Sequence, residues 1–300
     1  MLKTQKPLAS LALALFAVSS SASPLVYVTA SNLTNGSQQF GTVDLGTGAF
    51  HQIGSATLEG ESGLVRRPNG SFLTLGFSGR LNSINPATGV DTFVGPTGLA
   101  DCTSAASPCG PTSAANLAQL GGTIFATDFS NNLYTVDPVT GAATLIGPTG
   151  IPAFAFNPTI PNADGTMNIF DYSLFSTGGK LYEIFDVARL DPVTFAQTPV
   201  IPANLYRIDP LTGVATLIAA TAMNLTAVVD VNGVLYAFNG ALGQVVTLDL
   251  ATGNTSFVSN LDPAAGLILG AAPIPEPASI ALSGIGIAGI FLGSRRRRRS

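Results

Sequence analysis

The sequence predicts an all-β fold made of five repeated units, each with four short strands. Three observations support this prediction: a turn motif recurs five times, a strand segment precedes each copy, and the copies are evenly spaced. Repeats of about 40–50 residues with four strands each are typical of β-propellers, in which the blades surround a central axis. We therefore expect a five-bladed β-propeller.

The recurring motif is an apolar strand end, then Asp or Asn, two variable positions and Thr-Gly. Its copies are FGTVDLGTGAFHQIG from Phe40, LNSINPATGVDTFVG from Leu81, LYTVDPVTGAATLIG from Leu133, LYRIDPLTGVATLIA from Leu205 and VVTLDLATGNTSFVS from Val245. In the third copy Asp137 can accept backbone N–H bonds, Pro138 fixes one φ angle, and Gly141 supplies a positive φ. Each copy therefore predicts a β-hairpin, and its Asp and Thr are turn residues rather than metal ligands or catalytic groups.

A further strand precedes each hairpin, and another apolar segment lies upstream of it. The preceding strands are PLVYVTA at Pro24, GSFLTLGF at Gly70, GTIFATDF at Gly122, GKLYEIFD at Gly179 and GVLYAFNG at Gly233. Their glycines are spaced by 52, 57 and 54 residues. The upstream segments lie near Leu64, Leu117 and Val228. One repeat thus holds about four strands, which is one blade.

The two ends of the repeat region predict a closed ring. AAGLILGAA from Ala264 resembles an upstream segment with no hairpin after it, and the strand at Pro24 lacks such a partner. Pairing the two would close five blades and remove the open sheet edges. Two alternatives remain: an insertion near Phe185 to Ala203 as a degraded sixth blade, and an open β-solenoid or two-sheet sandwich. The copies resemble the LYxIDPxTG repeats of bacterial secreted propellers, and this resemblance implies the architecture rather than an activity.

The N-terminus predicts export. Lys3 and Lys6 precede an apolar run from Leu8 to Val18, and small residues follow it. This order is typical of a secretory signal peptide, and the run is too short to span a bilayer, which needs about 20 apolar residues. We expect residues 1–22 to be removed by cleavage after Ala22. An uncut membrane anchor is the alternative.

The C-terminus predicts a membrane-directed tail. Apolar and small residues at 278–293 precede Arg295, Arg296, Arg297, Arg298 and Arg299. The basic end should stay in the cytoplasm, which places the body of the protein outside. Pro275, Glu276 and Pro277, followed by this apolar segment and the arginines, resemble the PEP-CTERM sorting signal, so we expect 23–272 to be the propeller and 273–300 the signal.

The PEP-CTERM resemblance has implications for the route of the protein. It implies a short hydrophobic transmembrane helix and an exosortase, a membrane-embedded cysteine protease that cuts near the motif. The chain would then be an inner-membrane-anchored precursor in a Gram-negative bacterium, and later a cell-surface or secreted protein. A tail anchor that is never cut is the alternative.

Charge and cysteines narrow the possible partners. Between Pro24 and Pro277 there are six basic and 17 acidic residues, a net charge of −11, which argues against nucleic acid as a partner. Cys102 and Cys109 lie seven residues apart, and in an exported protein this spacing predicts a disulfide that closes a small loop. The sequence argues against a zinc site, because there is no second cysteine pair and the sole histidine, His51, is distant in the sequence.

No catalytic set is evident in the sequence. His51 follows the first turn and reads as a surface residue. The candidate carboxylates for glycoside hydrolysis are scattered over the repeats: Glu59, Glu61, Asp171, Glu183 and Asp186. Asp128, Asp171 and Asp186 could line one face and hold calcium, the single cofactor that the sequence suggests, or could be solvated loop carboxylates. We therefore expect no catalytic residues.

These observations favour a non-enzymatic surface or matrix protein that uses a propeller as a binding platform. Its expected partners are an exosortase-type protease, the inner membrane transiently, and an extracellular polysaccharide. The alternative is a periplasmic or extracellular calcium-dependent propeller hydrolase of the lactonase or esterase type.

Overall fold

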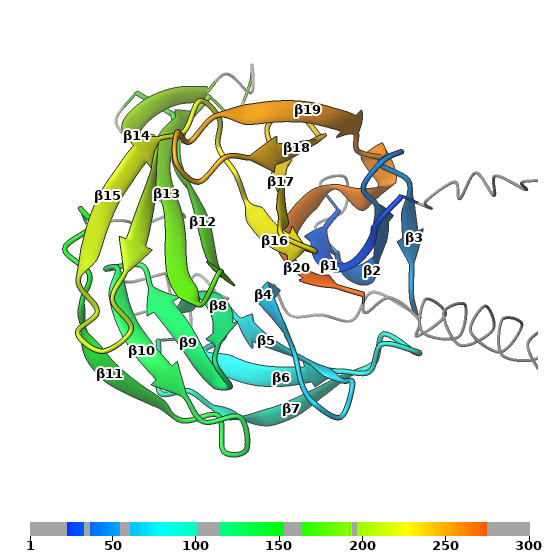
Figure 1. The fold of residues 1–300 in the computed structure, drawn as a ribbon, viewed down its shortest axis with the longest axis vertical. Helices are drawn as coiled ribbons and strands as arrows, with labels where there is room; N and C mark the ends of the chain where they lie inside the picture. The colour runs from blue at the N-terminus through cyan, green and yellow to red at the C-terminus, as the bar shows by residue number, and fades with distance from the viewer. Residues whose placement is uncertain are drawn as a thin grey trace, which may run out of the picture.

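Five four-stranded antiparallel sheets surround a common axis (Figure 1). The computed structural model describes residues 23–32, 37–54, 61–100, 114–152, 162, 164–191, 193 and 197–274. From the axis outward, blade 1 contains β20 (Leu267–Pro273), β1 (Leu25–Ser31), β2 (Gln38–Asp44) and β3 (Phe50–Gln52). Blade 2 contains β4 (Glu61–Arg66), β5 (Phe72–Gly76), β6 (Arg80–Ile84) and β7 (Asp91–Pro96).

The other three blades have the same order of strands. Blade 3 contains β8 (Ala114–Leu120), β9 (Thr123–Asp128), β10 (Asn132–Val136) and β11 (Ala143–Pro148). Blade 4 contains β12 (Met167–Thr177), β13 (Lys180–Leu190), β14 (Gln197–Ile208) and β15 (Ala215–Ala220). Blade 5 contains β16 (Ala227–Val231), β17 (Val234–Asn239), β18 (Gln244–Leu248) and β19 (Thr255–Asn260). The predicted five-bladed propeller is confirmed, and the solenoid, the sandwich and the sixth blade are wrong.

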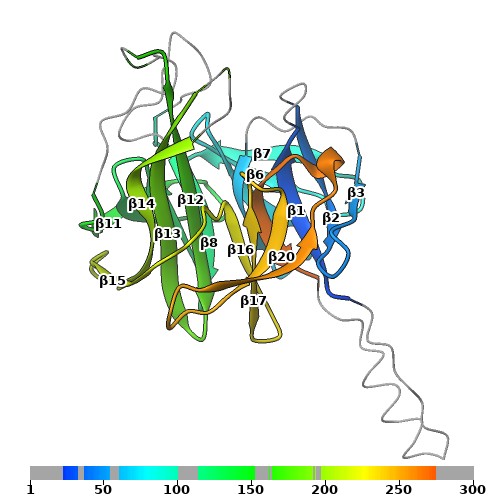
Figure 2. The ribbon, with the colours of Figure 1, turned by 90° about the horizontal axis from the view of Figure 1, so that it is seen from above.

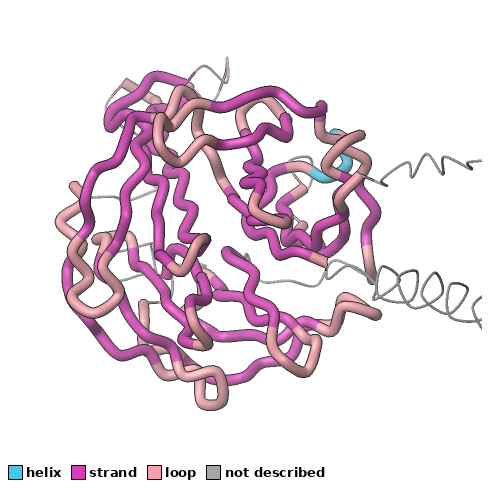
Figure 3. The backbone as a smooth tube through the Cα atoms, in the orientation of Figure 1, coloured by secondary structure: helices cyan, strands magenta, loops and turns pink. Residues whose placement is uncertain are grey.

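The ring closes as the ends of the sequence predict. β20 pairs with β1 antiparallel, with Val26 opposite Pro273 and Val28 opposite Ala271. Blade 1 thus combines the last strand of the chain with its first three, which leaves no sheet open between blades 5 and 1. A short 3-10 helix, η1 (Pro263–Ala265), leads into β20 (Figure 3).

The insertion near Phe185 to Ala203 lengthens blade 4 rather than adding a blade. β12, β13 and β14 have 11, 11 and 12 residues, whereas the strands of the other blades have seven or fewer. The extra residues continue the β12–β13–β14 ladder, with register shifts around Val187. Extended pairing satisfies the backbone groups of the added chain without a new sheet.

The apolar core lies between neighbouring blades. Its buried clusters each combine side chains of two adjacent blades: Leu73 with Ile124 between blades 2 and 3, and Ile184 with Val246 between blades 4 and 5. Between blades 1 and 2, the Tyr27 ring packs against the Phe72 ring in a tilted arrangement, with 4.9 Å between the ring centroids. Burial of a Leu, Ile or Phe side chain contributes about 1.5–3 kcal/mol to the free energy of folding. Each interface between neighbouring blades therefore stabilises the ring.

The turn chemistry of the repeats is confirmed. The Asp137 carboxylate accepts hydrogen bonds from the N–H groups of Val139 (2.7 Å) and Thr140 (3.0 Å), and Gly141 has φ = +82°. A role not visible in the sequence is close packing, because a Cβ at Gly141 would lie 2.6 Å from the Gly95 carbonyl of blade 2. The repeated glycine therefore also allows each turn to touch the preceding blade.

The propeller has two different ends. At the end that we call the tail face, β1 begins, β20 ends, and the inner hairpins turn at 67–71, 121–122, 178–179 and 232–233. The five Asp/Asn-Thr-Gly turns also lie at the tail face. In blade 1, for example, Asp44 at the end of β2 pairs with Leu25 at the start of β1. The opposite end, the loop face, carries the turns at 77–79 and 129–131 and the extended end of blade 4 (Figure 2).

Candidate functional site

A cavity of about 320 Å³ lies on the propeller axis. Its walls are the inner strands β4, β8, β12, β16 and β20, one from each blade. Each of these strands is the edge of its sheet, so alternate backbone N–H and C=O groups point away from the sheet, toward the axis. The cavity wall therefore presents hydrogen-bonding groups from all five blades.

The cavity opens at the tail face. Deep in the cavity, Asn116 and Ser173 are each 2% exposed. Toward the tail face the lining side chains become accessible: Gln119 and Ser176 are half-buried, and Arg66 is exposed. The polar groups of the mouth thus come from the strand ends next to the inner hairpin turns.

Two inner-strand contacts fix the shape of this mouth. The Ser176 hydroxyl of blade 4 donates to the Gln119 carbonyl of blade 3 at 2.5 Å. The Thr177 hydroxyl donates to the Asp230 carboxylate of blade 5, which also accepts the Gly233 N–H at 2.8 Å. These bonds tie blades 3, 4 and 5 together around the opening.

Arg66 is the cation of the mouth. Its side chain lines the cavity at the end of β4, and within the described part of the chain it makes no ion pair or hydrogen bond. By contrast, the Asp230 carboxylate, also at the mouth, is held by two donors. A guanidinium with all five donors available can bind a carboxylate, sulfate or phosphate in a bidentate manner.

Two carboxylates that seemed scattered in the sequence meet in blade 4. Asp171 on β12 and Asp186 on β13 are directly opposite each other in the register. Burial raises the pKa of both, the charge of Asp171 raises that of Asp186 further, and a hydrogen bond from Asn224 opposes the rise at Asp171. The pair therefore retains a proton at pH values at which ordinary carboxyls are ionised.

Glu183 lies on the other side of the same sheet, in the seam with blade 3. It is 0% exposed, and among the residues that the structure describes neither of its carboxyl oxygens has a hydrogen-bond partner. Burial raises the pKa of Glu183 to about 8; the nearby Thr127 hydroxyl opposes this rise, and the Asp128 charge adds to it. Glu183 is therefore held mainly as the neutral acid at pH 7.

The Asp128 carboxylate is held within a turn. Its carboxylate accepts the N–H groups of Ser130 and Asn132, the Asn132 side-chain amide and the Tyr134 hydroxyl, all at 2.8–2.9 Å. Burial raises the pKa of Asp128, although these four bonds oppose the rise. With its lone pairs engaged, Asp128 closes the β9–β10 turn on the loop face.

The three carboxylates predicted as a calcium set do not gather at one point. Asp171 faces Asp186 in blade 4, while Asp128 is engaged in its own turn in blade 3. Over the described ranges, no group of three or more His, Cys, Asp or Glu side chains could hold a metal ion. His51 is exposed on β3, opposite Thr42, as expected for a surface residue.

Several predicted features lie outside the described residues. They are the signal peptide (1–22), Glu59, Cys102 and Cys109 with their expected disulfide, the C-terminal hydrophobic helix, and the sorting residues Pro275, Glu276, Pro277, Arg295, Arg296, Arg297, Arg298 and Arg299. In the part of the chain that the structure describes, no helix is long and apolar enough to cross a membrane.

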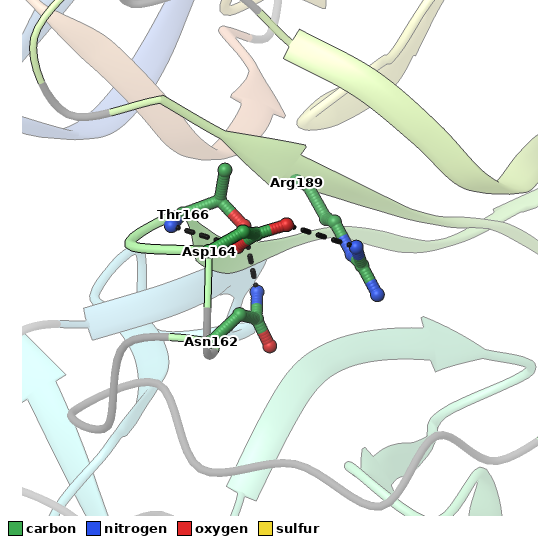
Figure 4. A network of polar contacts seen from close by, with 4 residues as sticks. All are labelled: Asn162, Asp164, Thr166 and Arg189. Carbon is green, nitrogen blue, oxygen red and sulfur yellow. Dashed lines mark hydrogen bonds and ion pairs between the residues drawn. The ribbon is translucent and has the colours of Figure 1, made fainter.

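A polar network on the loop face closes the extended end of blade 4 (Figure 4). The Asp164 carboxylate accepts the Thr166 hydroxyl at 2.6 Å and lies 3.2 Å from the Arg189 guanidinium. Thr166 and Arg189 lie at the outer ends of the β12–β13 hairpin. Both charged side chains are about half exposed, so the ion pair stabilises the fold by at most about 1 kcal/mol. Its role is local, holding the end of the β12–β13 hairpin.

Comparison with known families finds a sorting signal at the C-terminal end of the sequence. Residues 273–298 match the family model described as the PEP-CTERM protein-sorting motif. This chain carries a PEP-CTERM sorting motif. The PEP-CTERM tail implies an exported, membrane-transiting precursor that is processed by an exosortase, a membrane protein. The tail begins where β20 ends, so it leaves the propeller at the tail face.

Solved structures with a similar backbone fold share little sequence identity with this chain. The nidogen/laminin complex includes a chain with 11% identity and a TM-score of 0.47, over 83% of this chain and 97% of that one. The PQQ-bound aldose sugar dehydrogenase from Streptomyces coelicolor has 13% identity and a TM-score of 0.43, over 74% and 87%. No curated protein sequence matches this chain. These similarities assign no ligand or activity to this chain.

The site candidates predicted from the sequence include Asp171, Glu183 and Asp186 but not Arg66. The alternating pattern places a residue on one side of a sheet, whereas access to the axis depends on the twist of the inner strand and on its distance from the mouth. One signal was available: Arg66 ends the upstream strand segment at Leu64, and upstream segments form the innermost strands of a propeller.

Proposed function

We propose that this exported propeller is a non-enzymatic binding module of the cell surface or extracellular matrix. Its ligand would be an acidic sugar residue of an extracellular polysaccharide, bound at the axial mouth on the tail face. The observation that carries the proposal is the Arg66 guanidinium, which has no partner within the described ranges, at the mouth of a cavity lined by five strand edges.

The chemistry of the mouth suits such a ligand. A uronic acid offers one carboxylate for Arg66 and several hydroxyls for Gln119, Ser176 and the free backbone groups of the inner strands. A volume of about 320 Å³ lies at the lower end of the range of small-molecule pockets, roughly 300–1,000 Å³, and fits one sugar unit rather than a long chain segment.

The net negative charge of the body does not prevent this binding. At physiological salt, exposed charges further apart than about 8 Å are largely screened from each other, so contacts at the mouth dominate. The carboxylate at the opening, Asp230, already accepts hydrogen bonds from Thr177 and Gly233, which reduces its pull on Arg66.

The test is the affinity of the processed, exported protein for oligomers of glucuronic or galacturonic acid, measured by isothermal titration calorimetry against neutral glucose oligomers. Arg66→Gln should weaken uronate binding about 10- to 100-fold, the value of a hydrogen bond to a charged group. Arg67→Gln is the matched control, because Arg67 is the next residue and does not line the cavity. Equal effects of the two variants, or equal affinity for neutral oligomers, would contradict the proposal.

The second candidate is a calcium-dependent propeller hydrolase, and the Asp171–Asp186 pair favours it. Paired carboxyls with raised pKa values are typical of acid–base sites. The test is turnover of lactone, ester and glycan substrates with calcium and with chelator, in the exported protein and in Asp186→Asn. Turnover that requires calcium and disappears in Asp186→Asn would establish the hydrolase and remove the non-enzymatic proposal.

A further inference from the structure

The position of the sorting tail gives the propeller a fixed orientation. β20 ends at Pro273 beside Val26, at the start of β1, so the last described strand ends on the tail face. The apolar part of the tail starts at Ala278, four residues after Ile274. An extended chain spans at most about 3.6 Å per residue, so this link reaches at most about 14 Å.

The link is short compared with the propeller. A folded domain of about 250 residues has a radius of gyration of about 18 Å. A tether shorter than this radius cannot let the domain turn over and present its loop face to the bilayer. While the tail is in the membrane, the tail face must therefore stay close to the lipid surface.

Exposed apolar side chains also project from the tail face. Leu211 is 86% exposed and Val139 is 74% exposed, both at the tips of Asp-x-x-Thr-Gly turns. Leu25 and Val234 are 47% and 43% exposed where strands begin on the same face. Apolar tips close to a bilayer gain by entering its interfacial region.

We propose that the tail face is a membrane-docking surface of the precursor, with the lipid bilayer as its occupant. Leu211 and Val139 contact the headgroup region, and the loop face points away from the membrane. The inference goes beyond the proposed function, because it rests on the tail position and the apolar tips, and not on any ligand of the cavity. The same orientation turns the cavity mouth toward the membrane until the tail is cut.

The test uses the full chain, with its tail, reconstituted in vesicles of phosphatidylcholine and phosphatidylglycerol that carry a nitroxide on a fraction of the headgroups. Single cysteines for a fluorophore replace Val139 or Leu211 on the tail face, and Leu242 or Val193 on the loop side, in a Cys102→Ser, Cys109→Ser background. All four positions are exposed, at 59–86%, so the probes are matched in accessibility.

We expect the lipid nitroxide to quench the two tail-face probes at least threefold more than the two loop-side probes. A water-soluble quencher should give the opposite order. Equal quenching at all four positions, or stronger quenching at Leu242 and Val193, would overturn the orientation. Because this readout needs no sugar, its failure and the failure of the Arg66 binding test are distinguishable.

Discussion

Glu183 makes the stability of the propeller fall as the pH rises. The folded chain holds this carboxyl with a pKa of about 8, whereas an unfolded chain gives an ordinary value near 4.5. Between these two values the folded state binds more protons than the unfolded state, so the free energy of unfolding decreases with pH. This contribution is fully favourable below pH 4.5 and is lost by about pH 8.

The magnitude follows from the same two pKa values. Each pH unit between them lowers the free energy of unfolding by about 1.4 kcal/mol. At pH 7 the loss relative to pH 4.5 is about 3 kcal/mol. Glu183→Gln keeps the size and the neutral state of the buried group and removes its titration, so this variant should lack that part of the slope.

The assay is urea unfolding of the parent and of Glu183→Gln at half-unit steps from pH 5 to pH 8. The two proteins should have nearly equal stability at pH 5, and the variant should be about 3 kcal/mol more stable at pH 7, or roughly 6–12 °C higher in Tm. Asp137→Asn is the control. The backbone N–H groups of Val139 and Thr140 hold the pKa of Asp137 below its usual range, so that variant should leave the slope above pH 5 unchanged.

Parallel stability curves for the parent and Glu183→Gln would refute the reasoning. The Asp171–Asp186 pair titrates in the same direction, so the parent slope alone would not be decisive. The difference between the two slopes isolates Glu183, because both proteins contain the pair.

Two further predictions concern the ring itself. Gly141→Ala should cost at least 2 kcal/mol more in urea unfolding than Gly98→Ala, since both glycines have φ = +82° but only the Cβ at Gly141 meets a neighbour, the Gly95 carbonyl; equal losses would deny the contact between turn and blade. Ala272→Pro should lower the free energy of unfolding by about 3 kcal/mol or more, because proline cannot donate the ladder hydrogen bond opposite Tyr27; unchanged unfolding would deny closure by β20.

Much of the fold could be predicted because each blade repeats the same local chemistry. Asp137, Thr140 and Gly141 specify a hairpin within a few residues, and five hairpins with unpaired end segments favour a closed ring. The contact between Gly141 and Gly95 was not predictable, because it depends on how two blades are placed and not on the order of residues along one.

The candidate site was harder to predict than the fold. Asp171 and Asp186 are 15 residues apart and become opposite only through the register of the lengthened β12–β13 hairpin. In the sequence, Glu183 lies on an ordinary strand, and nothing there marks its side chain as buried. Its burial comes from blade 3, which packs over this side of the sheet. Arg66 gains its position at the mouth from the meeting of five strands that are far apart in the sequence.

The measurement that tests the account most directly is the intact mass of the protein isolated from the extracellular fraction. A processed, exported propeller should begin near Ser23, retain the closing strand β20 through Pro273, and lack Arg295 to Arg299. An extracellular protein that still carries residues 1–22 or the five terminal arginines would contradict export by a signal peptide and release at the PEP-CTERM tail.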